Sequence, residues 1–164
     1  MNKKILFSIL TLTFLTSFLF AQNRALPNIN IKTLEGNNFN ITEIENEGKP
    51  IVISFWATWC KPCKKELNNI ADIYDDWQEQ TGVKLVAISI DDTRSMSKVA
   101  PYVNASDWHY EVYLDPNSDL KRALGVSTVP HTFLLNGKNE IVWEHKGYVE
   151  GDEIKLFQEI QKIK

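Results

Sequence analysis

The amino-acid sequence predicts one α/β domain over residues 26–164, with a mixed central sheet flanked by helices. Two nearly continuous apolar runs, 51–57 and 83–90, are typical of central strands that are covered on both faces. The segment between them repeats apolar residues every three or four positions, which is typical of a helix packed against such strands. These observations define a β-α-β unit, and its crossover connection is expected to be right-handed.

An N-terminal β-hairpin is predicted ahead of this unit. Its strands are expected at 29–32 and 38–41, because short alternating stretches flank a polar turn there. The helix of the β-α-β unit is expected to run from the residues after Cys60 to Thr81, since Gly82 is a helix stop signal. Its apolar positions are Leu67, Ile70, Ile73, Tyr74 and Trp77.

A central inserted segment, 91–119, and a β-β-α unit are predicted to complete the domain. The insert is less periodic than the rest. Its aromatic residues Trp108 and Tyr110 are expected to pack in the core, the alternative being that they line a groove for a partner. The turn signal at 136–139 predicts a second hairpin. The remaining elements are expected as helices over 96–103, 121–124 and 152–163 and as strands over 110–114, 132–135 and 140–144.

Residues 1–21 differ in composition from the rest of the chain. Lys3 and Lys4 precede an uncharged apolar and hydroxylic run over 5–21. A positive start, an apolar stretch and the small residue Ala21 indicate a secretory signal peptide, so the domain is expected in the periplasm or cell envelope. The run of 17 residues is at the short end of what spans a bilayer, and an uncleaved membrane anchor is the alternative.

The charge balance excludes some partners. Removing residues 1–21, which carry two lysines and no acidic residue, leaves 16 basic and 21 acidic residues, a net charge of −5. Without a stripe of Lys and Arg, nucleic acid is not expected to bind. Asp91, Asp92 and Asp115 follow predicted strands, where acidic residues are expected as caps and turns. No metal site or cofactor is therefore predicted, and a monomer is expected.

The chemistry is predicted to centre on the only two cysteines, Cys60 and Cys63, at the junction of a buried strand and a helix. Free N–H groups and the positive end of the helix dipole stabilise a thiolate there, and Lys61 adds a nearby cation. Pro62 suits the first helical turn and stiffens the loop. A Cys60 thiolate can attack the disulfide of a partner, and Cys63 can resolve the mixed disulfide.

Other uses of the two cysteines fit the sequence less well. Attachment of a c-type haem needs a histidine after the second cysteine, where Lys64 stands. A structural zinc site needs four ligands, and there is no second pair of cysteines. A peroxidase of the peroxiredoxin type would need a Pro and a Thr at set positions ahead of Cys60, and that arrangement is absent. An inert structural disulfide stays open, although so short a loop is typical of reducible bonds.

Two segments resemble the signatures of a known family. The run FWATWCKPCKKEL, at 55–67, is similar to the active-site signature of the TlpA/ResA-like branch of exported thioredoxin-fold thiol-disulfide oxidoreductases. The run GVSTVPHTFLL, at 125–135, resembles the cis-proline segment of the same family. The resemblance covers about residues 26–164. It implies a thioredoxin fold with the N-terminal β-hairpin and the central inserted segment.

The resemblance also implies roles for individual residues. Cys60 corresponds to the exposed nucleophile and Cys63 to the more buried resolving thiol of a redox-active disulfide. Trp59 corresponds to the aromatic flank of the nucleophile, and Pro130 to a cis-proline that faces the two sulfurs. Val129 would offer its backbone to an extended substrate in strand-like pairing.

Three further positions bear on the handling of protons. Glu66 lies on the same helical face as Cys63 and matches an acidic residue proposed in the family to manage protons, the alternative being a solvated carboxylate. Thioredoxin has a buried acid where this chain has Ser54, so that route is not available. His131 stands where the family commonly has a small hydroxyl residue. It could tune the thiolate, or it could be a partly exposed strand residue without a role.

The sequence therefore predicts an exported thiol-disulfide oxidoreductase with a Cys60/Cys63 dithiol. The resemblance favours the reducing direction, with apocytochrome c or other envelope proteins as substrates and a membrane thiol-disulfide protein as electron donor. The alternative is a non-catalytic binding module of the same fold for a metal or haem-assembly partner.

Overall fold

An eight-stranded sheet forms the centre of the computed structural model, which describes residues 24–163. Its strands lie in the order β1-β8-β7-β4-β5-β6-β2-β3. Their bounds are β1 Arg24–Ala25, β2 Asn30–Thr33, β3 Asn38–Asn40, β4 Ile51–Trp56, β5 Lys84–Ser89, β6 Glu111–Leu114, β7 His131–Leu135 and β8 Glu140–Lys146. Because β4 pairs in parallel with β5 and antiparallel to β7, the predicted mixed sheet is confirmed.

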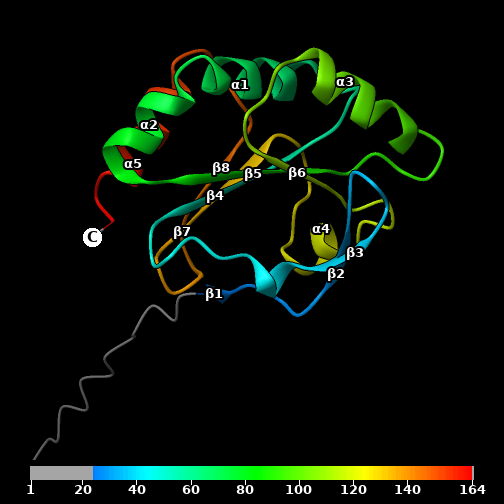
Figure 1. Cartoon of the computed structure of the whole chain (residues 1–164), viewed down its shortest axis with the longest axis horizontal. Helices are drawn as coiled ribbons and strands as arrows, with labels where there is room; N and C mark the ends of the chain where they lie inside the picture. Colours follow the sequence, from blue (N-terminus) through cyan, green and yellow to red (C-terminus); the bar gives the residue numbers. More distant parts are fainter. Residues whose placement is uncertain (1–23, 164) are drawn as a thin grey trace, which may run out of the picture.

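Helices cover both faces of this sheet (Figure 1). In that view α1, α2, α3 and α5 lie above the sheet, and α4 lies below it beside β2 and β3. The bounds are α1 Lys61–Ala71, α2 Tyr74–Thr81, α3 Val99–Ala105, α4 Asp119–Ala123 and α5 Asp152–Ile160, with short 3-10 turns η1 Ile41–Glu43 and η2 Met96–Lys98. The predicted α/β fold with flanking helices is confirmed.

The predicted β-α-β unit consists of β4, α1 with α2, and β5. All six residues of β4 are buried, as expected of a strand covered on both faces. The chain leaves β4 at Trp56 and enters α1 at Lys61, so the two cysteines lie at the edge of the sheet where β4 ends.

The N-terminal hairpin is also confirmed, and it joins the main sheet. β2 pairs with β3 through Ile31 and Phe39, and on its other side it pairs antiparallel with β6 through Lys32 and Leu114. The hairpin therefore extends the sheet beyond the inserted segment. The two-residue strand β1, which pairs with β8, was not predicted, because two residues carry no periodic signal.

An aromatic cluster fastens the inserted segment to α1. The ring of Trp108 lies 4.9 Å from Trp56, 5.5 Å from Tyr102 and 5.2 Å from Tyr110, measured between centroids. Trp108 Nε1 donates to Asn68 Oδ1 at 2.9 Å, and the Tyr110 hydroxyl donates to the carbonyl of Leu67 at 3.0 Å. Trp108 and Tyr110 are buried, so their predicted place in the core is confirmed.

The prediction of one continuous helix up to Thr81 is wrong, because the helix breaks between α1 and α2. Ile73 has φ −127° and ψ 5°, outside the helical region. The break redirects the chain so that Trp77 stacks on Phe157 of α5 at 5.2 Å and the Tyr74 hydroxyl accepts the N–H of Leu85 at 3.0 Å. Apolar periodicity continues across the break, which is why the sequence pattern did not reveal it.

The other predicted elements are present with ends shifted by a few residues. The predicted signal peptide or anchor, 1–21, lies outside the described residues. Among residues 24–163, no helix is long and apolar enough to cross a membrane.

The Tyr74 hydroxyl gives a test of how α2 is held. It accepts the backbone N–H of Leu85 in β5. This N–H lies outside the pairing with the shorter strand β6, which begins only at Val86. Tyr74→Phe leaves the N–H of Leu85 unpaired and is expected to lower the free energy of unfolding by about 1–3 kcal/mol. Urea unfolding of the oxidised protein measures it. Tyr113→Phe, which removes a half-exposed contact with Glu111, is the control and should cost less than about 0.5 kcal/mol. Equal losses in both variants would contradict this account.

Candidate active site

The two cysteines form a disulfide at the N-terminus of α1, with their Cα atoms 5.3 Å apart. Cys60 is the N-cap residue, and its Sγ accepts the N–H of Cys63 at 3.3 Å. Pro62 occupies the first turn, where a missing N–H has no effect on the helix. Cys60 is 5% exposed and Cys63 is not exposed at all, so Cys60 is the less buried of the two cysteines. The position favours a thiolate at Cys60 once the bond is reduced.

The loop before Cys60 is held by the buried carboxylate of Asp91, a residue for which the sequence predicts only a cap or turn. Asp91 is fully buried and accepts the N–H of Thr58 at 2.8 Å and its hydroxyl at 2.6 Å. The Ser89 hydroxyl donates to the same carboxylate at 2.8 Å. Asp91 thus joins the loops that follow β4 and β5. One sequence signal could have revealed this role. Asp91 follows the buried strand β5, which pairs with β4, and β4 leads to the cysteines.

Two of the three predicted substrate-binding residues line one hollow of about 300 Å³. Trp59, which is 65% exposed, lines it together with Val129. The peptide bond between Val129 and Pro130 is cis, as the resemblance implied, and Pro130 is buried. The structure therefore brings Trp59 of the cysteine loop and Val129 of the proline segment to the same hollow, although 70 residues separate them in the sequence.

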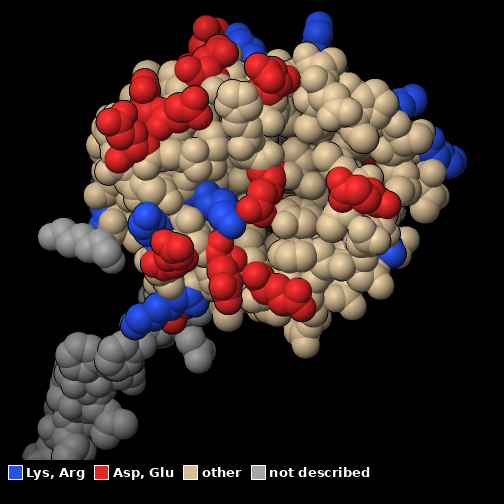
Figure 2. All heavy atoms as spheres, in the orientation of Figure 1, with Lys and Arg blue, Asp and Glu red and all other residues tan. Residues whose placement is uncertain are grey.

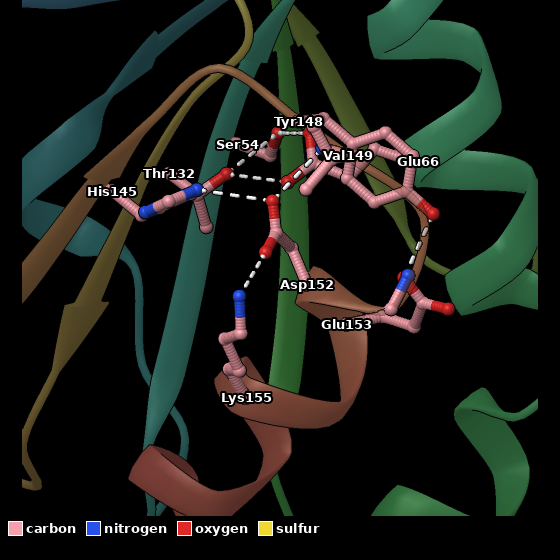
Figure 3. A network of polar contacts seen from close by, with 10 residues as sticks. Ser54, Glu66, Thr132, His145, Tyr148, Val149, Asp152, Glu153 and Lys155 are labelled. Carbon is pink, nitrogen blue, oxygen red and sulfur yellow. Dashed lines mark hydrogen bonds and ion pairs between the residues drawn. The ribbon is translucent and has the colours of Figure 1, made fainter.

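Behind the disulfide, Glu66 joins α1 to the two central strands (Figure 3). Its Oε1 accepts the Thr132 hydroxyl of β7 at 2.9 Å, and its Oε2 accepts the Ser54 hydroxyl of β4 at 3.4 Å. The two hydroxyl oxygens are 3.3 Å apart. Glu66 is 4% exposed, so the alternative of a solvated helix carboxylate is wrong. The sequence predicts no role for Ser54, because its place opposite Thr132 depends on the register between β4 and β7.

Burial raises the pKa of Glu66 to about 7 from the usual 4.5. The hydrogen bonds from Thr132 and Ser54 oppose this shift, and the nearby carboxylates of Asp152 and Glu153 add to it. These two residues belong to the polar network at the start of α5 that Figure 3 places beside Glu66. There Asp152 accepts from Lys155 at 2.8 Å and lies 3.3 Å from His145 Nε2. Glu66 can therefore take up or release a proton near neutral pH.

The three residues predicted to tune the thiol differ in their surroundings. Lys61 is exposed next to Cys60, and Pro62 lies in the first helical turn. His131 is only 1% exposed, its ring is stacked on Phe133 at 4.2 Å, and neither ring nitrogen has a hydrogen-bond partner among the described residues. Burial lowers the pKa of His131 below 6.5, so its ring is neutral at pH 7. A partly exposed histidine is excluded, and the tuning role stays a prediction.

Glu66 predicts how stability depends on pH. The folded-state pKa of about 7 exceeds the usual carboxyl value of 4.5, so between these values the unfolded chain loses a proton that the folded protein keeps. The stabilising contribution of protonated Glu66 is complete below pH 4.5, and it is lost as the pH rises through 7. Relative to Glu66→Gln, the free energy of unfolding of the wild type should fall by roughly 3 kcal/mol over this range.

Urea unfolding of the oxidised proteins at several pH values measures this difference. Glu79→Gln, an exposed position on α2, is the matched control and should keep the wild-type dependence on pH. If the curves of the wild type and Glu66→Gln run parallel, Glu66 does not titrate in this range.

Comparison with known proteins supports the chemistry of this arrangement. The family model described as "AhpC/TSA family" matches residues 23–144. The thiol-disulfide oxidoreductase ResA of Bacillus thuringiensis subsp. konkukian is 30% identical over 137 residues, which cover 84% of this chain and 75% of that protein. The sporulation thiol-disulfide oxidoreductase A of Bacillus subtilis is 31% identical over 130 residues, covering 79% and 76%.

Solved structures show the same fold. A thioredoxin-like protein from Porphyromonas gingivalis superposes with a TM-score of 0.76 at 44% identity, covering 86% of this chain and 94% of that one. StoA from Bacillus subtilis superposes with a TM-score of 0.62 at 29% identity, covering 80% and 99%. With its disulfide at the strand-to-helix junction, the chain belongs to the AhpC/TSA family of thioredoxin-like proteins and is a thiol-disulfide oxidoreductase similar to ResA.

Proposed function

We propose that this protein is an exported protein-disulfide reductase that uses the Cys60/Cys63 dithiol. Family membership favours the enzyme over the non-catalytic binding module that the sequence left open. The observation that carries the proposal is the pair itself: Cys60 at a helix N-terminus, bonded to the more deeply buried Cys63 one turn away. This asymmetry assigns attack to one sulfur and resolution to the other.

The reaction transfers two electrons in two exchanges. The Cys60 thiolate attacks one sulfur of a substrate disulfide, which forms a mixed disulfide and releases the first substrate thiolate, protonated from water. The Cys63 thiolate then attacks Cys60 Sγ, which releases the second substrate thiolate and leaves the Cys60–Cys63 disulfide. The substrate is reduced to a dithiol, and the protein is oxidised to the form described above.

Glu66 serves the second exchange in this proposal. Cys63 is fully buried, and burial disfavours the charged thiolate, so this thiol needs a base to accept its proton. Glu66 follows Cys63 by three residues on α1, and the two side chains therefore share a face of the helix. A carboxyl group with a pKa of about 7 can accept the thiol proton at neutral pH and return it when the disulfide is reduced again.

Trp59 and Val129 hold the substrate. Both residues line the same hollow, and Trp59 directly precedes Cys60 in the sequence. The backbone of Val129 pairs with an extended segment of the substrate. The proposed substrates are disulfides of envelope proteins such as apocytochrome c, and a membrane thiol-disulfide protein supplies the electrons. The charge pattern of residues 1–21 supports export, with those residues acting as a signal peptide or as an anchor.

Replacing the resolving thiol tests the proposal directly. Reduced Cys63→Ser, mixed with a disulfide-bonded protein, should accumulate a mixed disulfide at Cys60, because nothing in the chain can resolve it. Mass spectrometry after thiol trapping identifies the linked cysteine. Cys60→Ser is the matched control and should trap much less of the partner, because its one remaining thiol, that of Cys63, is fully buried. If wild type fails to cycle in a glutathione redox series and Cys63→Ser traps no partner, the proposal is wrong.

A further inference from the structure

A groove leads from the proline segment past Trp59 to basic residues of the inserted segment. It consists of two hollows, of about 300 and about 490 Å³, that share Trp59, Ile90 and Lys121. The smaller is otherwise lined by Ser127, Thr128 and Val129, and the larger by Asp92, Arg94, Ser95 and Lys98. The two hollows together are called the basic groove below.

Two lysines give the basic groove its net charge. Arg94 is engaged by Asp92, whose Oδ2 accepts from Nη2 at 2.8 Å and from Nε at 3.0 Å, so these two charges largely cancel. Lys98 and Lys121 form no ion pair with any residue in the part of the chain that the structure describes. Two uncompensated positive charges therefore line the larger hollow.

The positive charge of the basic groove is opposite in sign to the net charge of the protein. Residues 22–164 carry a net charge of −5. Figure 2 shows acidic side chains gathered over the α2 end of the visible face, with basic side chains standing out at the edge beyond α3. The positive charge of the basic groove is therefore local, because the protein as a whole is acidic. A positively charged groove favours a negatively charged ligand.

The apolar wall of the groove supplies an anchor. Trp59 is 65% exposed directly before the nucleophilic Cys60, and together with Ile90 and Val129 it lines the smaller hollow. An exposed tryptophan in a hollow provides contact area for a bound chain. Because Lys121 lines both hollows, a segment that pairs with the backbone of Val129 passes Trp59 and meets the two lysines.

We propose that the basic groove selects protein substrates whose target cysteine is flanked by acidic residues in an extended segment. The inference rests on the proposed function and adds the substrate class. Trp59 and Ile90 contact the segment near the cysteine, and Lys98 and Lys121 receive its carboxylates. Exposed charges of this kind act mainly on the rate of association, and salt screens them.

A rate comparison with three peptides tests the proposal. The peptides are identical except that the single cysteine is flanked by two Asp, two Gln or two Lys, and each cysteine is bonded to the same coloured aromatic thiol. Reduced protein converts this mixed disulfide into two thiols and is itself oxidised, and the released thiol is followed by absorbance. At low ionic strength the Asp peptide should react about two- to fivefold faster than the Gln peptide, and the Lys peptide more slowly.

Ionic strength and charge variants separate the groove from the overall charge. Between about 0.01 M and about 1 M salt the screening length falls from about 30 Å to about 3 Å, so the preference should shrink toward none. In Lys98→Gln/Lys121→Gln the ratio of the Asp to the Gln rate constant should fall toward one, and Lys98→Glu/Lys121→Glu should favour the Lys peptide. The matched control, Lys49→Gln/Lys138→Gln, removes the same charge at the opposite end of the sheet and should keep the wild-type ratio.

The outcomes distinguish this inference from the proposed function. If the reduced protein acts on all three peptides at equal rates, or if the two double Gln variants change the ratio alike, the basic groove does not select acidic segments, while the reductase stands. If no peptide is reduced, the proposed function fails, and the substrate preference fails with it.

Discussion

The carboxyl group of Glu66 ties the helix that carries both cysteines to the two central strands. It lies in a buried position where its partners are the hydroxyl groups of Ser54 and Thr132. Two neutral hydroxyl donors do not compensate a buried negative charge, so the folded protein keeps the proton up to about pH 7. The carboxyl group that holds α1 in place is therefore also the group that we propose as the proton acceptor for Cys63.

The reactive end of the molecule is assembled from segments that are distant in the sequence. Asp91 holds the loop that precedes Cys60, the aromatic cluster around Trp108 fastens the inserted segment to α1, and Val129 of the proline segment lines the same hollow as Trp59. None of these contacts touches the sulfurs directly in the described hydrogen-bond network, yet together they position the cysteine loop and form the groove beside it.

The sequence predicted the fold and the two cysteines because those features leave local signals. The apolar run that became β4 and the turn between β7 and β8 were recognised from residue patterns alone. What it missed depends on contacts across the chain. The break at Ile73 is set by packing of α2 on β5 and α5 and leaves the apolar period intact. The roles of Ser54 and Asp91 depend on which strands lie side by side, which periodicity does not reveal.

The reduction potential of the Cys60–Cys63 pair tests the reductase account most directly. Equilibration with glutathione or dithiothreitol buffers, followed by thiol alkylation and mass spectrometry, measures it on the full domain. A protein-disulfide reductase should have a low potential, nearer the value of about −270 mV for thioredoxin than that of about −120 mV for the oxidant DsbA. A value close to the latter would mean that the pair donates its disulfide to partners, and the proposed direction of electron flow would be wrong.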